Sequence, residues 1–114
     1  MENTNSLFGK CPYSTAQKVF SGKWSIIIIY NLTEGALRFG ELQRKVGDIT
    51  QATLTKQLRM LEDFGLVNRH VYSEIPPKVE YSLTDLGKEF KPVLEQFRIW
   101  GDKYIESLKN PLRS

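Results

Sequence analysis

The residues that could do chemistry gather in one short segment, residues 49–65. Its polar side chains are small, amide-bearing or cationic, and no acid appears before Glu62. Small residues let a helix backbone approach a duplex, while lysine and arginine reach phosphates or guanine edges in the major groove. We therefore expect contacts to double-stranded DNA from the following residues of this segment: Gln51, Ala52, Thr53, Thr55, Lys56 and Arg59.

These residues are expected to play different parts on DNA. Arg59 or Lys56 would recognise guanine, and Gln51, near the helix start, would reach a base edge or a phosphate. A bidentate base contact discriminates between bases by about 1–3 kcal/mol. Cationic residues elsewhere are expected to contact phosphates, which raises affinity without sequence preference. These residues are Arg38, Arg44 and Lys78.

The segment itself has the signals of one amphipathic helix. Thr50 is a favourable N-cap, and Gly65 can adopt the left-handed conformation that ends a helix. Leu54, Leu58 and Leu61 recur at helical spacing and would form a buried stripe. An ordinary helix with a solvated polar face would show the same pattern, so the neighbouring elements must decide between the two interpretations.

The neighbours favour a helix-turn-helix with a wing. A small helix over Gly40–Val46 precedes the tight turn at Gly47 and Asp48, which leads into the segment above. Downstream, residues 66–72 and 78–83 alternate between apolar and polar side chains and read as strands. Two prolines in residues 73–77 exclude a two-residue turn, so the pair is expected to be a hairpin with a rigid tip.

The region before the helix-turn-helix is less clear. Pro12 suits the entry to a short helix over about Ser14–Phe20. Residues 23–32 contain four consecutive isoleucines, Ile26 to Ile29, which favour a buried strand by propensity. A buried helix of about ten residues fits equally well, because periodicity cannot separate the two for a short apolar run.

The last helix is predicted to run from the cap at Thr84 to about Leu108, with a kink at Pro92. Large apolar residues on it recur with an average spacing near 3.5, which is typical of a helix–helix seam. The stripe could pack on its own domain or form a two-fold dimer interface. We expect the dimer seam to contain Phe90, Val93, Phe97, Trp100 and Tyr104.

Length and composition limit the remaining possibilities. A chain of 114 residues predicts one domain, here a flexible arm over residues 1–10 and a folded part over residues 11–114. The net charge of +3 permits an acidic partner, although a slightly basic enzyme would look the same. One cysteine, no apolar leader and no apolar run near the ~20 residues of a membrane span favour a cytoplasmic protein.

Other chemistries have little support. Cys11 lies near a helix start and beside Lys10, which would lower its pKa and make it reactive, or it could be a small buried residue. With one cysteine per chain, oxidation would join two chains or add a small thiol or electrophile. His70 has no second ligand at metal spacing, and no nucleophile elbow or phosphate-cradling glycine loop is present, so no metal, cofactor or enzyme activity is expected.

From about Cys11 to Ser107 the sequence resembles the HxlR-type winged-helix transcriptional regulators of bacteria and archaea, relatives of the MarR group. The resemblance implies that residues 23–32 are helical, that terminal helices form a homodimer, and that two recognition helices read an inverted repeat, usually to repress. It also implies that a cysteine at the position of Cys11 can sense oxidants or electrophiles. The motifs are Cys11-Pro12, Gly22-Lys23-Trp24, Arg38-Phe39, Glu41-Leu42, Leu54-Thr55, Gln57-Leu58, Leu61-Glu62, Gly65-Leu66-Val67, Leu86-Gly87 and, most specifically, the run from Pro76 to Thr84.

The predicted fold is therefore mainly α with a small β-hairpin wing, and the predicted function is a DNA-binding repressor acting as a homodimer. A second class is a protein-interaction module that uses the fold without DNA. A third is a small-molecule sensor with a pocket between the seam helix and the N-terminal helices, lined by Trp24, Phe97 and Trp100. Fold alone does not choose among these classes.

Overall fold

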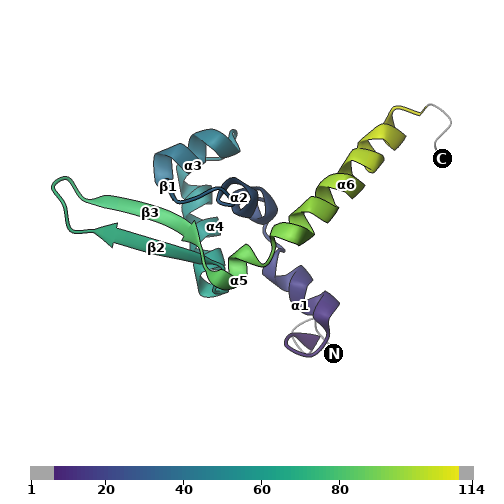
Figure 1. Ribbon diagram of the computed structural model, residues 1–114, viewed down its shortest axis with the longest axis horizontal. Helices are drawn as coiled ribbons and strands as arrows, with labels where there is room; N and C mark the ends of the chain where they lie inside the picture. Colours follow the sequence, from purple (N-terminus) through teal and green to yellow (C-terminus); the bar gives the residue numbers. More distant parts are fainter. Residues whose placement is uncertain (1–6, 111–114) are drawn as a thin grey trace.

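The computed structural model describes residues 7–110, and their order of elements is that of a helix-turn-helix followed by a wing (Figure 1). Within this range the strands form one antiparallel sheet in the order β1-β3-β2. The predicted fold class is confirmed. The elements are α1 (Pro12–Val19), α2 (Ser25–Asn31), β1 (Leu37–Arg38), α3 (Phe39–Val46), α4 (Gln51–Asp63), β2 (Val67–Tyr72), β3 (Lys78–Leu83), α5 (Asp85–Lys88) and α6 (Lys91–Leu108).

The molecule has a central body from which α1, the β2–β3 hairpin and α6 project (Figure 1). Helices α2, α3 and α4 pack together beside the sheet, the β2–β3 hairpin extends to one side, and α6 extends to the other (Figure 1). The overall dimensions are 59 × 39 × 26 Å. None of the helices within residues 7–110 is long and apolar enough to cross a membrane.

The core forms where apolar stripes from several elements meet. Ile28 and Ile29 of α2 are fully buried, so the isoleucine run is a helix, as the family resemblance implied. Burial of both side chains against α3 and α4 outweighs the modest strand preference of β-branched residues. The predicted stripe of Leu54, Leu58 and Leu61 is buried as expected. The other buried apolar side chains of the core are Leu32, Leu42, Ile49, Leu66, Val67, Tyr81 and Leu83.

Helix α4 begins and ends where its signals predicted. The Thr50 hydroxyl accepts a hydrogen bond from the Thr53 amide at 3.1 Å, which satisfies one free donor of the first turn. Gly65 has φ +80°, a conformation that a side chain at this position would oppose, and the chain turns there into β2. These two residues fix the length of the helix that carries the predicted DNA contacts.

The C-terminal region differs from the prediction. It is not one helix kinked at Pro92 but two helices, α5 and α6, separated at Glu89 and Phe90. Pro92 lies in the first turn of α6, where its missing N–H interrupts no helical hydrogen bond. Phe90 stacks on Phe20 with ring centroids 4.0 Å apart, so this predicted seam residue packs within its own chain.

The N-terminal region also differs in detail. Helix α1 starts at Pro12, two residues earlier than predicted. Residues 1–6 of the expected arm, and residues 111–114, lie outside the described residues. Residues 7–10 form a turn, closed by a hydrogen bond of 2.9 Å from the Gly9 amide to the Thr15 hydroxyl. Phe8 reaches Phe64 at a ring distance of 6.4 Å, so this part of the chain is packed on the body.

Close approach of α5 to the start of β2 generates a stability prediction. Gly87 is buried, and a methyl group added to it would collide with the backbone carbonyl of Leu66. Gly87→Ala should therefore lower the free energy of unfolding by about 1–3 kcal/mol, as measured by urea denaturation followed by circular dichroism. Gly40→Ala is the control, because a methyl group there meets only ordinary contacts and should be neutral or stabilising. Equal stability of both variants would contradict the close packing of Gly87 against the Leu66 carbonyl.

Candidate nucleic-acid interface

Helix α4 presents three different faces. Leu54, Leu58 and Leu61 point into the core and are buried. The side chains of Ala52 and Lys56 are exposed and lie about one third of a turn away from the wing-facing side chains. The third face looks toward the sheet and carries Gln51, Thr55, Arg59 and Glu62. The predicted DNA contacts are thus divided between an outer ridge and a face beside the wing.

An open groove separates α4 from the wing. Its volume is about 500 Å³. Arg59 and Glu62 project from the helix side, Arg69 projects from β2, and Val79 and Tyr81 belong to β3. We call this the helix–wing groove, and its lining residues are Phe39, Gln51, Thr55, Arg59, Glu62, Arg69, Val79 and Tyr81.

The strand register gives the hairpin two unlike faces. Val67, Arg69 and Val71 of β2 lie opposite Leu83, Tyr81 and Val79 of β3, and these pairs share the face turned toward α4. Arg69 is the charged residue among them. Arg69 was not among the residues predicted to contact DNA, although the sequence shows its place between two valines in the alternation.

The opposite face of the wing holds a polar network. Tyr72 donates a hydrogen bond of 2.9 Å to Glu80, and the Lys78 ammonium lies 3.4 Å from the same carboxylate. The Lys78 ammonium also sits 4.7 Å from the centre of the Tyr72 ring. The Tyr72 hydroxyl, with Lys78 and Arg38, holds the pKa of Glu80 below its ordinary value.

Two of the residues predicted to contact phosphates lie on this outer face, away from α4. Arg38 is paired in register with Glu80, so it shares the outer face of the sheet, and Lys78 is engaged by Glu80. Arg44 is exposed in the last turn of α3. The structure therefore places Gln51, Thr55 and Arg59 together in the groove but does not bring Arg38 or Lys78 to it.

Two of the predicted threonine contacts have local partners. The Thr55 hydroxyl donates to the Gln51 carbonyl at 2.9 Å, and Thr53 accepts from the Thr50 hydroxyl at 2.9 Å. The Thr55 hydroxyl proton is therefore already used inside the helix. Thr55 can offer a groove ligand its methyl group and its oxygen as an acceptor.

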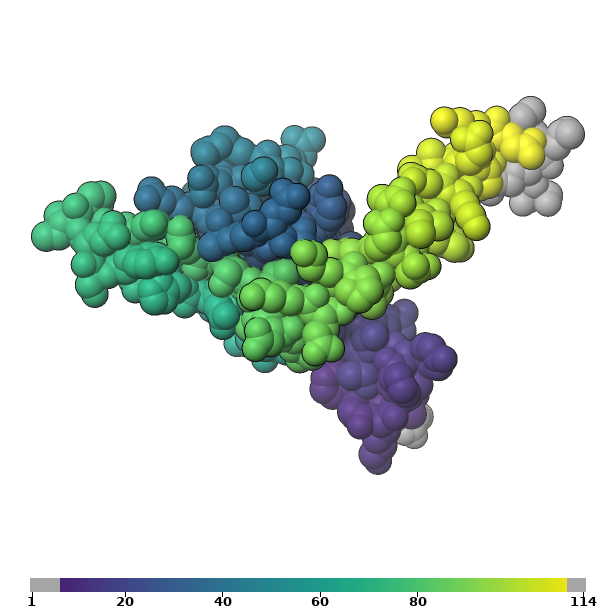
Figure 2. Space-filling model, viewed as in Figure 1, coloured from purple at the N-terminus to yellow at the C-terminus, as the bar shows by residue number. Residues whose placement is uncertain are grey.

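The C-terminal part of α6 projects away from the rest of the described molecule, whereas its N-terminal part borders α2 (Figure 2). Its predicted seam residues are partly exposed: Val93 by 41%, Phe97 by 47%, Trp100 by 64% and Tyr104 by 46%. Trp100 and Tyr104 stack on each other with ring centroids 5.3 Å apart. An apolar stripe of this size facing solvent is typical of an interaction surface.

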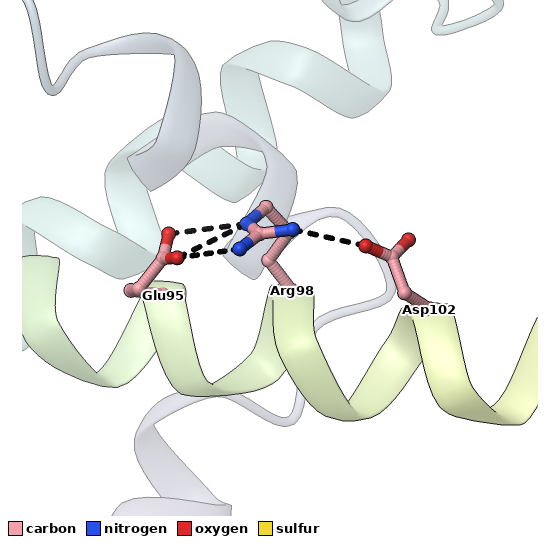
Figure 3. Close-up of polar contacts among 3 residues, drawn as sticks. All are labelled: Glu95, Arg98 and Asp102. Atoms are coloured by element: carbon pink, nitrogen blue, oxygen red, sulfur yellow. Dashed lines mark hydrogen bonds and ion pairs between the residues drawn. The ribbon is translucent and has the colours of Figure 1, made fainter.

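A charged ladder runs beside this stripe on the same helix. The Arg98 guanidinium binds Glu95 at 2.7 Å and Asp102 at 2.9 Å (Figure 3). These contacts raise the pKa of Arg98 and lower that of Glu95. Glu95, Arg98 and Asp102 are thus paired within the helix, and the adjacent apolar stripe is largely exposed.

A second groove, of about 470 Å³, lies between α2 and α6. Phe97 lines it, as predicted for a ligand pocket, but Trp24 and Trp100 do not. Its apolar wall comes instead from residues of α2 and from one further residue of α6: Ile26, Ile27, Tyr30 and Leu94.

Cys11 is half-buried at the N-cap of α1. Hydrogen bonds from the Ser14 amide and hydroxyl, together with the Tyr13 amide, lower the pKa of the Cys11 thiol. Lys10, which the sequence analysis invoked, is not among the causes. Within residues 7–110 no group of three His, Cys, Asp or Glu residues is placed to hold a metal ion.

A helix-turn-helix followed by a two-stranded wing defines the winged helix-turn-helix class of transcriptional regulators. The chain belongs to the HxlR-like helix-turn-helix family, whose model matches residues 19–109. This confirms the family that the sequence resembles. The chain is accordingly a transcriptional regulator with a helix-turn-helix fold, and its homologues are regulators rather than enzymes.

Individual relatives support the same assignment. The HTH-type transcriptional regulator YdeP of Bacillus subtilis (strain 168) is 45% identical over 101 residues, which cover 89% of this chain and 79% of YdeP. The redox regulator HypR in its reduced form has a TM-score of 0.81 and 42% identity, covering 87% of this chain and 98% of HypR. The putative HTH-type transcriptional regulator ytcD has a TM-score of 0.80 and 41% identity, covering 84% and 98%.

The network on the outer face of the wing predicts a pH-dependent stability. Because the pKa of Glu80 is lowered on folding, its stabilising contribution is present above the unfolded pKa near 4.5 and is lost as the pH falls through the folded value. Wild type should unfold at higher urea than Glu80→Gln at pH 7, and the difference should shrink below pH 4.5.

The control for this comparison is Glu34→Gln. Glu34 lies on the exposed turn after α2 and forms no ion pair with any residue between 7 and 110. Its substitution should leave the pH dependence of the urea midpoint unchanged. A constant difference between wild type and Glu80→Gln from pH 7 to pH 3 would show that the network does not stabilise ionised Glu80.

Proposed function

We propose that this regulator binds DNA sequence-specifically as a homodimer, recognises an inverted repeat and acts as a repressor. The observation that carries the proposal is the surface of α4. Lys56 is exposed on the outer ridge and Arg59 faces the helix–wing groove, and neither has an ion-pair partner in the described part of the chain. A repressor of this kind blocks transcription by occupying DNA that the polymerase needs.

On DNA, α4 would enter the major groove. Ala52 lets the helix backbone come close to the bases, and Lys56, on the same ridge, reaches guanine. Gln51 in the first turn contacts a base edge or a phosphate, since the N-terminal residues of a recognition helix lie nearest the bases. Arg44, at the end of α3, contacts the backbone.

The apolar stripe of α6 supports the dimer. Phe97, Trp100 and Tyr104 lie on one side of a helix that the rest of its own chain leaves exposed. A two-fold pairing of these helices would remove the stripe from water and place two copies of α4 in a symmetric arrangement. Two such helices read half-sites centred about 34–36 Å apart, one turn of the duplex.

The proposal predicts the outcome of selection from a random-sequence DNA pool. The reduced protein at moderate salt should enrich one inverted repeat with half-site centres about 10 base pairs apart, as read by sequencing. The affinity should fall steeply with salt, because phosphate contacts release counterions. Absence of any enrichment and of any DNA affinity at low salt would favour the protein-interaction module instead.

Trp100→Glu provides a matched control for the dimer. The substitution puts a charge on the exposed stripe without touching α4 or the core, so the fold should persist. The variant should sediment as a monomer and lose preference for paired half-sites. A dimer that survives this change would place the interface elsewhere.

A second candidate function, response to oxidants or electrophiles, is favoured by the lowered pKa of Cys11. A larger thiolate fraction at neutral pH increases reactivity. Among the solved structures, HypR is described as a redox regulator in reduced and oxidised forms. In this chain a peroxide would take two electrons from the thiolate and leave a sulfenic acid, which condenses with another thiol to a disulfide and water.

This candidate predicts that oxidation acts through one residue. Brief treatment with hydrogen peroxide should change the affinity of wild type for the selected operator, and addition of dithiothreitol should restore it. Cys11→Ser should bind the operator normally and ignore the oxidant. An equal response of both proteins in a fluorescence anisotropy titration would remove Cys11 from this role.

A further inference from the structure

Arg59 and Arg69 face the same space from opposite sides. Arg59 comes from α4 and Arg69 from β2, and both line the helix–wing groove. The lining contains two further ionisable side chains, the carboxylate of Glu62 and the phenol of Tyr81. The remaining walls are neutral, so the groove concentrates positive charge between two rigid elements.

Neither guanidinium has a polar partner in the described part of the chain. No hydrogen bond or ion pair joins Arg59 or Arg69 to any residue between 7 and 110, whereas Arg98 on α6 is held by two carboxylates (Figure 3). Arg69 also stands on the apolar face of the hairpin, beside Val67 and Val71 and opposite Tyr81. Both arginine side chains are exposed, so their guanidinium groups are free to meet an anion that arrives from outside.

The geometry of double-stranded DNA suggests that this anion is a backbone phosphate. When α4 lies in the major groove and the hairpin extends beside it, one sugar–phosphate strand must pass between the two elements, since this strand separates the major groove from the adjacent minor groove. The helix–wing groove is the space between those elements. Two planar guanidinium groups approaching from opposite walls match the oxygens of one phosphate.

We propose that Arg59 and Arg69 together clamp a single phosphate of the DNA backbone in the helix–wing groove. This inference rests on the proposed DNA-binding function, and it assigns Arg59 to the backbone and leaves Lys56 as the guanine contact. Glu62 limits the clamp, because its carboxylate repels phosphate and weakens binding to any sequence alike. Arg69 is a DNA-binding residue that the sequence patterns had not assigned.

The test compares four proteins on two duplexes: wild type, Arg59→Gln, Arg69→Gln and the double variant, each titrated with the selected operator and a scrambled duplex of equal length. Each single variant should lose about tenfold in affinity at fixed salt, equally on both duplexes. In the double variant the slope of log affinity against log salt should become shallower by about 0.9, the value for one phosphate.

Controls separate the clamp from general charge and folding effects. Lys109→Gln removes a positive charge at the C-cap of α6 and should leave both affinities unchanged. Arg59→Lys and Arg69→Lys keep the charge but lose the planar fork, so they should retain the salt slope with a smaller loss of affinity. Glu62→Gln should increase affinity for both duplexes.

Several results would overturn the clamp. A slope change of about 1.8 in the double variant would assign the arginines to two different phosphates. A new base preference in Arg59→Gln would make Arg59 a base contact, and an unchanged affinity in Arg69→Gln would remove Arg69 from the interface. Failure of wild type and Lys109→Gln to bind any duplex at low salt would instead overturn the proposed function, and the clamp with it.

Discussion

The leucine stripe of α4 is the contact on which the rest of the structure depends. Leu54, Leu58 and Leu61 are buried among residues from α2, α3 and the sheet, and their burial fixes the rotation of the helix about its axis. Once these side chains point inward, Lys56 must point outward and Arg59 toward the wing. The surface proposed to meet DNA is thus determined by hydrophobic packing on the other side of the same helix.

Charge is distributed so that some cations are engaged and others are available. Lys78 and Arg98 are held by carboxylates of their own chain, while Lys56, Arg59 and Arg69 have no such partner in residues 7–110. Exposed ion pairs contribute little to stability. Their main effect here is to neutralise the positive charge of Lys78 and Arg98, so that these surfaces attract an anionic partner less strongly. The net charge of +3 underestimates this asymmetry, because it averages over faces that differ.

The sequence predicted the features that depend on neighbouring residues better than those that depend on contacts between distant parts of the chain. Thr50, Gly65 and the alternation of the hairpin act locally, and they located α4 and the wing correctly. The isoleucine run fitted two structures, and only the family resemblance chose the helix. The break before α6 falls just ahead of Pro92, a residue that suits a helix start as well as a kink. The stacking of Phe90 on Phe20 beside it joins distant positions that no local pattern relates. The packed structure was likewise needed to show which face of the hairpin is turned toward α4, and hence to propose a role for Arg69.

The same stacked pair has a mechanical consequence. Phe90 precedes α6 and stacks on Phe20 at the C-terminal end of α1, so this contact lies at the base of the projecting helix. A helix of 18 residues is about 27 Å long, and a tilt of about 10° at its base moves the far end by about 5 Å. In a dimer held by α6, such a tilt would change the separation of the two α4 helices while the pitch of the duplex stays constant. A small change of angle near Phe20 would thereby prevent the two α4 helices from fitting successive major grooves of the DNA at the same time.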